Sequence, residues 1–268
     1  MKKYLLLLTF LSVIGNAQIV RKYSNEFLNI GAGARGLAMG GAVISNQNDV
    51  YAPMWNPAGL TEVESDWQGA AMHAEYFESI AKYDYISFAK ALDSKDGVLG
   101  ISIVRLGVDN ILNTTQMIDS EGNIDYDKIS KFSTSDYAGI ISYAFRPGGN
   151  QKLSVGINAK IVYRNIGKFA NGFGFGFDAG AIYRADSGYQ FGAMLRDATT
   201  TVNFWSINQK ELSAVVNGEE FNPAPKDKME ITMPKLNLGV SKNFEINRDL
   251  ELLPEAGLNV DFAKTAAV

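Results

Sequence analysis

The fold of this chain is indicated by residues 171–184, whose sequence is NGFGFGFDAGAIYR. Apolar side chains occupy every second position from Phe173 to Tyr183, and most of the positions between them hold glycine or Asp178. Successive side chains of a β-strand point to opposite faces of a sheet. This period of two therefore predicts a strand with one apolar face and one face that is small and polar.

The same alternation recurs along the chain after about residue 66. The candidate strands are residues 67–75, 82–91, 98–106, 135–145, 154–164, 171–184, 189–196, 236–244 and 252–262. Many of them approach the length of about 9–11 residues that a tilted strand needs to cross a bilayer. The sequence thus predicts an all-β, antiparallel protein of about nine strands.

The second face of these strands favours the lumen of a membrane barrel. It contains glycine, serine, asparagine and isolated charged residues, and few bulky side chains. Tyr163, Tyr183 and Tyr189 lie near strand ends, as the aromatic girdles of outer-membrane barrels do. A soluble β-sandwich also alternates, because one face of each sheet meets water. Composition by itself therefore allows either class.

The connections support a barrel more strongly. Short links with turn residues are expected at 92–96, 146–151, 185–188 and 245–249. The alternate links include two long loops, residues 107–134 and 197–235. Short turns on one side and long loops on the other are typical of bacterial barrels, whose long loops lie outside the cell.

The expected strand number is odd, whereas single-chain bacterial barrels have an even number. The last residues of the sequence, Lys264–Val268, do not have the pattern of a terminal strand that ends in an aromatic residue. Either the strand count is wrong or a longer barrel continues beyond residue 268, and we favour the second interpretation.

The composition of the chain excludes several kinds of functional site. The chain has 268 residues, no cysteine and a formal net charge of −4. The absence of cysteine excludes disulfides, cysteine-based zinc sites and thiol nucleophiles. No basic stripe is present, so we expect no nucleic-acid partner. After the N-terminal region, no apolar run reaches the about 20 residues that a transmembrane helix needs.

The N-terminus predicts export. Met1-Lys2-Lys3 is basic, residues 4–14 are apolar, and small residues at Gly15 and Ala17 fit a cleavage site. The apolar core is too short for a membrane anchor. We expect a signal peptide at residues 1–17, and localisation in the outer membrane.

Three motifs resemble sites that carry chemistry, and none is expected to be catalytic or to hold a cofactor or metal. Residues 31–36 match G-x-G-x-x-G, but Gly40 and Gly41 interrupt the helix that should follow in a dinucleotide site. A tight segment where backbone approaches backbone is the preferred interpretation. The single histidine, His73, is expected in a barrel wall. The acidic loop 119–127 is expected to be a solvated turn, with calcium binding as the alternative.

The most informative stretch is Met54-Trp55-Asn56-Pro57-Ala58-Gly59-Leu60. Pro57 restricts Asn56 to extended geometry, and Gly59 permits a sharp turn. We predict a plug motif at the barrel mouth, with a simple N-terminal cap as the alternative. Its residues are Asn56, Pro57, Ala58, Gly59 and Leu60.

Asn56–Leu60 resembles the N-P-A-G-L signature of the long-chain fatty acid transporter superfamily of outer-membrane barrels. The longer pattern in residues 27–42 and 55–60 is similar to the PorV/PorQ family of Bacteroidetes. Residues 83–89, 105–111, 122–127 and 135–137 strengthen the similarity toward PorV. The resemblance covers most of the chain and is most specific over residues 27–145.

This resemblance implies a barrel of about 14 strands with an N-terminal plug. It further implies a role in type IX secretion, in which such barrels receive the C-terminal sorting domains of secreted proteins. The implied partners are outer-membrane lipid, the type IX translocon barrel and the surface attachment proteins.

We therefore expect a signal peptide (1–17), a plug segment (18–66) and a barrel (67–268), with no enzymatic activity. The long loops 107–134 and 197–235 are the predicted docking surface for client domains. Two alternatives remain: a transporter for hydrophobic small molecules, and a secreted soluble β-protein or surface enzyme.

Overall fold

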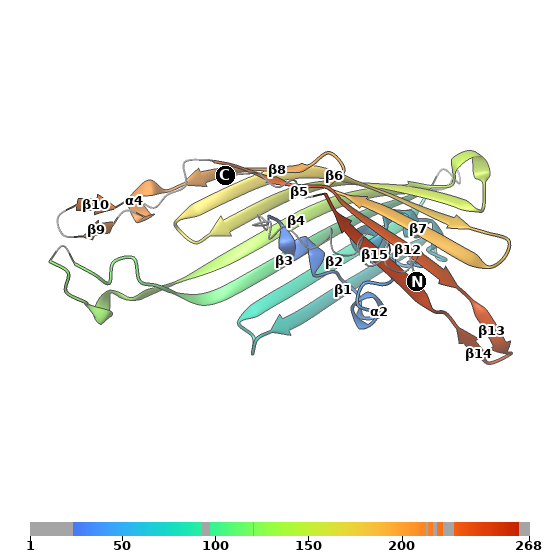
Figure 1. Cartoon of the computed structure of the whole chain (residues 1–268), viewed down its shortest axis with the longest axis horizontal. Helices are drawn as coiled ribbons and strands as arrows, with labels where there is room; N and C mark the ends of the chain where they lie inside the picture. The colour runs from blue at the N-terminus through green and yellow to red at the C-terminus, as the bar shows by residue number, and fades with distance from the viewer. Residues whose placement is uncertain are drawn as a thin grey trace, which may run out of the picture.

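The chain folds as a large antiparallel β-sheet with a short, partly helical N-terminal segment against one of its faces (Figure 1). The computed structural model describes residues 24–92, 97–119, 121–212, 214–216, 219–221 and 228–262. The expected signal peptide lies outside these residues. The helical turns are η2 (Glu26–Asn29), α2 (Ala34–Ala38), α3 (Ala52–Trp55), η3 (Pro57–Glu62), η4 (Tyr126–Lys128), η5 (Pro147–Gly149) and α4 (Gln209–Leu212).

Eleven strands form the main sheet. They are β1 (Trp67–Tyr76), β2 (Ala81–Ala91), β3 (Val98–Asn113), β4 (Ser130–Phe145), β5 (Leu153–Ile166), β6 (Ala170–Arg184), β7 (Tyr189–Arg196), β8 (Thr201–Ile207), β11 (Met229–Thr232), β12 (Lys235–Lys242) and β15 (Glu255–Asp261). Two separate hairpins consist of β9 (Ala214–Val216) with β10 (Glu219–Phe221), and β13 (Phe244–Asn247) with β14 (Leu250–Leu252). Figure 1 shows these two hairpins at opposite ends of the sheet.

Strands that follow one another in the sequence are neighbours in the sheet from β1 to β7, and β12 and β15 complete the order. The strand β8 continues the direction of β7 after a break at residues 197–200, and pairs with the first half of β6. The strand β11 precedes β12 in the same way and pairs with β8. Counted as continuous runs, the main sheet therefore has nine long strands, and this confirms the expected all-β, antiparallel class.

The two regions predicted as long loops contain strands. Residues 107–134 are largely an extension of the β3–β4 hairpin, which pairs as far as Asn113 and Ser130 after a bulge near Asn110. Residues 197–235 contain β8, α4 and β11, as well as the hairpin of β9 and β10. In the first region the two arms of the hairpin pair with each other, and in the second β8 pairs with β6 and β11, so the backbone groups find hydrogen-bonding partners.

The link at 245–249 is also different from the prediction, because it belongs to the protruding hairpin β13–β14. The remaining short links connect β2 to β3, β4 to β5 and β6 to β7 at the same end of the sheet. Within the described residues, β1 pairs only with β2 and β15 only with β12, so the sheet is open.

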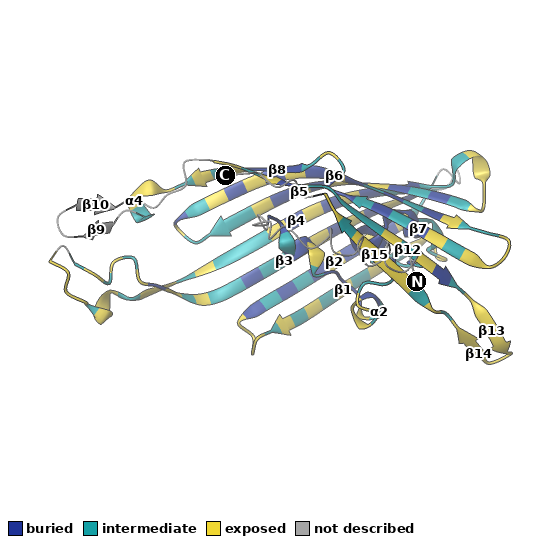
Figure 2. Ribbon diagram, viewed as in Figure 1, coloured by how far each residue is buried: buried dark blue, intermediate teal, exposed yellow. Residues whose placement is uncertain are grey.

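Burial alternates along the strands, as the sequence predicts (Figure 2). In β6 the odd-numbered residues Phe173, Phe175 and Phe177 are exposed, and the intervening glycines and Asp178 are buried. We call the face that holds the buried side chains the inner face, and the opposite one the outer face.

The core lies between the inner face and the N-terminal segment, residues 24–66. Bulky residues of β2 to β5 contribute to it, so the inner face is less uniformly small than the sequence indicated. The largest part of the core contains Phe27, Leu28, Ala32, Val43, Met54, Trp55, Tyr83, Tyr85, Val104, Ala138, Ile140 and Val162.

Candidate functional site

The five residues of the predicted plug motif lie together at the contact between the N-terminal segment and the inner face, and all five are buried. Asn56 is extended (φ −155°, ψ 106°), as expected for the residue before a proline. Pro57 then begins η3, where its missing N–H is not needed. The side chain of Asn56 accepts a hydrogen bond from the Ala58 N–H (3.2 Å) and so caps this turn.

Asn56 also joins the segment to the sheet. Its Nδ2 donates to the carbonyl oxygen of Ile44 within the segment (2.8 Å). The same amide lies 3.2 Å from the carbonyl oxygen of Ala181 in β6 and 3.4 Å from that of Ala193 in β7. The two N–H donors of this fully buried amide are thus shared among carbonyl groups of three separate chain segments.

Inner-face glycines make room for this turn. A Cβ at Gly156 would collide with the backbone of Pro57 and Ala58, and one at Gly180 would collide with Asn56 and lie 2.9 Å from Pro57 Cδ. These two glycines are directly paired between β5 and β6. The segment therefore approaches the backbone of the strands closely where side chains are absent.

The neighbouring strands continue this arrangement. A Cβ at Gly192 would collide with the Ile44 carbonyl, and one at Gly239 would lie 2.9 Å from the Ser45 nitrogen. Gly192 pairs with Gly239 in the register of β7 and β12. We call Gly156, Gly180, Gly192 and Gly239 the glycine seat.

The G-x-G-x-x-G motif surrounds the indole of Trp55. A Cβ at Gly31 or Gly36 would overlap the ring, and Trp55 Nε1 donates to the Ala32 carbonyl (2.7 Å). The motif thus permits a close approach, as expected, but the partner is a side chain and not another backbone. Its last three residues lie in a helix of only five residues (Ala34–Ala38), and it follows a 3-10 turn, not a strand.

A charged cluster lies beneath the segment. Lys160 Nζ is 2.7 Å from Asp178 Oδ1 and 2.5 Å from Asp197 Oδ1, and the three side chains are at most 6% exposed. Asp178 also accepts hydrogen bonds from Asn158 Nδ2 (3.1 Å) and the Asp197 N–H (2.8 Å). Asn158 in turn donates to the Pro53 carbonyl (2.9 Å), which joins the cluster to the segment.

Arg196, at the end of β7, donates to three groups of the segment. Its Nη1 contacts the Leu28 carbonyl (2.8 Å) and Asn29 Oδ1 (3.2 Å), and its Nη2 contacts the Met54 carbonyl (2.5 Å). A guanidinium suits this position because its fixed fork can serve several acceptors at once.

Hydrogen bonds from the start and the middle of the segment reach the last strands. Asn25 Nδ2 donates to Thr232 Oγ1 (2.9 Å), and Ser45 donates from its N–H and its hydroxyl to Glu255 Oε1 (2.7 Å each). The segment is therefore fixed to β11 and β15 as well as to the centre of the sheet.

Tyr51 lies at the start of α3, where it stacks on Tyr85 with ring centroids 5.4 Å apart. Burial, together with the negative charge of Asp49, raises the pKa of the Tyr51 phenol. Tyr51 therefore stays neutral through the physiological range.

His73 and the acidic loop lie away from this site. His73 is on the outer face of β1, with its Nδ1 2.6 Å from Asp84 Oδ1, and Asp84 also pairs with Arg105 (2.8 Å). Asp119 accepts hydrogen bonds from the N–H groups of Glu121 and Asn123 (2.9 Å each), and these bonds lower its pKa. The Asp119 carboxylate thus stabilises the turn of its own loop.

The alternating pattern places Lys160, Asp178 and Arg196 on the polar face, but it does not predict the ion pairs of the cluster or the contact of Arg196 with the segment. The available signal was a charged residue between apolar neighbours in the middle of a strand, which in a buried setting needs a partner. Asp197 was assigned to a loop, so its part in the cluster was missed.

No protein-family model and no curated protein sequence matches this chain. Among the described helices, none combines the length and apolar character required for crossing a membrane.

Proposed function

We propose that this protein is a non-enzymatic outer-membrane β-barrel of the PorV/PorQ type, plugged by its N-terminal segment and acting in type IX secretion. The observation that supports the membrane assignment is the outer face. Large apolar side chains are exposed there on consecutive strands. Examples are Ile86, Ile103, Ile141, Ile161, Phe175, Phe191 and Leu258.

The height of this apolar band suits a bilayer. In β6 it runs from Phe173 to Tyr183, ten residues apart, which corresponds to about 33 Å along a strand at about 3.3 Å per residue. A strand tilt of about 40° reduces this to about 25 Å, the usual height of the band in outer-membrane barrels. A soluble protein rarely exposes a continuous apolar surface of this extent.

The band has a polar boundary toward the long connections. His73, Asp84 and Arg105 are paired across β1, β2 and β3, and the same row continues to Tyr137 and Tyr163. Charged groups followed by tyrosines are typical of the membrane–water interface.

We further propose that the sheet closes into a barrel. The free edges of β1 and β15 expose backbone N–H and C=O groups, which lipid cannot satisfy. In the proposed barrel, further strands pair with both edges, and the N-terminal segment on the inner face is the plug.

The secretion role draws on the PorV/PorQ resemblance and on the position of the connections. The β3–β4 hairpin continues beyond the polar boundary to η4, and the connection from β8 to β11 lies at the same end. In this proposal these two projections bind C-terminal sorting domains outside the cell, and the plug blocks free diffusion through the lumen.

The test is binding of purified C-terminal sorting domains to the purified barrel in detergent. Shortening the β3–β4 hairpin within residues 112–131 should abolish binding. Shortening the β13–β14 hairpin, residues 244–252, is the matched control at the other end and should leave binding unchanged. Absence of binding to the unaltered barrel, or equal binding by both variants, would contradict the secretion proposal.

Transport of hydrophobic small molecules is the second candidate, and the lining of the inner cavity bears on it. A cavity of about 490 Å³ lies between the segment and β7, β12 and β15. Charged residues including Glu26, Arg196 and Lys235 line it. This polar lining favours the secretion proposal over passage of apolar molecules.

A further inference from the structure

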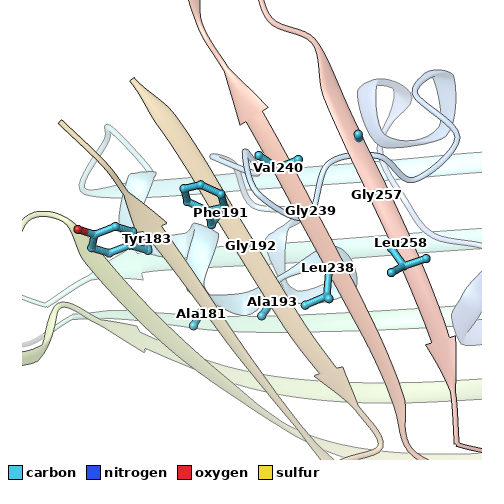
Figure 3. Close-up of a pocket in the computed structure, with 11 residues that line it drawn as sticks. Ala181, Tyr183, Phe191, Gly192, Ala193, Leu238, Gly239, Val240, Gly257 and Leu258 are labelled. Carbon is cyan, nitrogen blue, oxygen red and sulfur yellow. The ribbon is translucent and has the colours of Figure 1, made fainter. Parts of the chain in front are cut away.

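A shallow groove crosses the outer face of the last four strand runs, β6, β7, β12 and β15 (Figure 3). Its volume is about 630 Å³, within the range of about 300–1,000 Å³ that is usual for ligand pockets. Almost all of its lining is apolar, and Figure 3 shows Tyr183 and Phe191 near one another along one side.

The strand register explains why a groove forms here. One row across the four strands consists of Ala181, Ala193, Leu238 and Leu258. The next row consists of Tyr183, Phe191, Val240 and Ala256. Small alanines in each row lie beside larger neighbours, so the surface is lower at the alanines than around them.

A lysine lies at the end of this groove nearest the short links. Lys242 follows Val240 by two residues in β12 and pairs with Tyr189 of β7. Its Nζ is 4.5 Å from the centroid of the Tyr189 ring and 5.0 Å from that of Phe244. Cation–π contacts of this kind hold an ammonium in place and leave its other donors available.

Two other cations near this end are engaged by carboxylates. Lys152 pairs with Asp186 (2.6 Å), and Arg184 pairs with Glu62 (3.1 Å). Within the described residues, no carboxylate forms an ion pair with Lys242. An unneutralised cation beside an apolar groove is complementary to a molecule with one anionic end and a long apolar part.

We propose that this groove binds one anionic phospholipid of the membrane leaflet on the short-link side, with an acyl chain along the two rows and the phosphate beside Lys242. This inference depends on the proposed membrane location. A phospholipid is the occupant that matches both features, because its acyl chain needs no hydrogen-bonding partner and its phosphate accepts from an ammonium.

The test places a fluorescent reporter in the groove and a matched one outside it. F191W introduces the groove reporter, and F175W introduces the control, since both phenylalanines are 49% exposed on the outer face. Each variant is reconstituted into phosphatidylcholine vesicles that contain a minor fraction of brominated phosphatidylglycerol or brominated phosphatidylcholine. Quenching of the unsubstituted protein is subtracted, which removes the contribution of the native tryptophans.

We expect brominated phosphatidylglycerol to quench the F191W reporter with an apparent affinity about fivefold higher than brominated phosphatidylcholine. That ratio corresponds to about 1 kcal/mol for one lysine near an anionic lipid. Adding K242Q should remove the preference, whereas K152Q should preserve it. The F175W reporter should not distinguish the two lipids.

The remaining outcomes separate the two proposals. If both reporters are quenched equally by both lipids, or if the preference survives K242Q, the lipid site is wrong although the membrane location stands. If neither reporter is quenched by either lipid, the outer face does not contact a bilayer and the proposed function fails as well.

Discussion

Pro57 can approach Gly156 and Gly180 of the glycine seat only because these two residues have no side chain. Gly156 and Gly180 lie directly beneath the N-P-A-G-L turn, and a methyl group at either position would overlap the turn. Close packing leaves a protein interior little room to absorb such an overlap. The sequence showed the glycine-rich face, but only the register showed which glycines meet Pro57.

Gly180→Ala should therefore weaken the hold on the N-terminal segment. Overpacking costs about 1–3 kcal/mol, and the segment should become more accessible to protease in the folded protein. Gly139→Ala is the control, because nothing lies within 4 Å of a Cβ at that outer-face position. Equal protease resistance in both variants would contradict the close contact.

The buried cluster makes a second prediction about single residues. Lys160→Met leaves the carboxylates of Asp178 and Asp197 without their cation, so we expect a loss of about 3–5 kcal/mol in the free energy of unfolding. Lys152→Met, which removes an exposed pair with Asp186, should cost at most about 1 kcal/mol. Denaturant titration of both variants measures the difference, and similar losses would rule out a special role for the cluster.

At the scale of elements, the nine predicted strands correspond to the nine long runs of the sheet. The ends of β3 and β4 were missed because the pattern changes at the bulge near Asn110. The strand β8 was missed although Val202 and Phe204 alternate with buried residues, because residues 197–200 interrupt the run before it. Single-strand patterns do not reveal that two short runs share one partner, as β7 and β8 share β6.

Trp55 gives a prediction for the N-terminal segment as an element. Its indole fills the space that the glycine motif leaves, so Trp55→Ala should create a cavity and cost about 3–5 kcal/mol. Trp67→Ala is the control, since Trp67 is 65% exposed on the outer face. Limited proteolysis should remove the segment faster in the first variant only. Equal rates in both variants would show that the indole does not hold the segment in place.

At the scale of the whole molecule, sequence patterns identify the apolar band but not closure of the sheet. Alternation assigns each residue to a face, whereas closure depends on which strands pair at the edges of β1 and β15. The charged cluster could not be predicted as a unit, because the register of the strands brings together Lys160 of β5, Asp178 of β6 and Asp197 from the link after β7.

Depth within the proposed membrane should determine the effect of a charge. Ile141→Lys places an ammonium in the middle of the band of β4, where the expected cost is about 2–4 kcal/mol. Tyr137→Lys, in the row with Arg105, should cost at most about 1 kcal/mol. Urea titration of the protein folded into lipid vesicles provides the measurement. Equal costs, or a protein that is folded and monomeric in buffer without detergent, would contradict the membrane assignment.

The break between β7 and β8 has a consequence for how the sheet keeps its alignment. Four steps along β6, from Ala179 to Phe175, correspond to seven steps from Leu195 to Val202. Regular alternating strands can slide past each other by two residues without exchanging their faces. Here such a slip would separate Asp197 from Lys160 and would break the hydrogen bonds that Asp178 and Phe177 of β6 accept from the N–H groups of Asp197 and Ala198. The interruption at residues 197–200 thus favours a single register of β7 and β8 on β6.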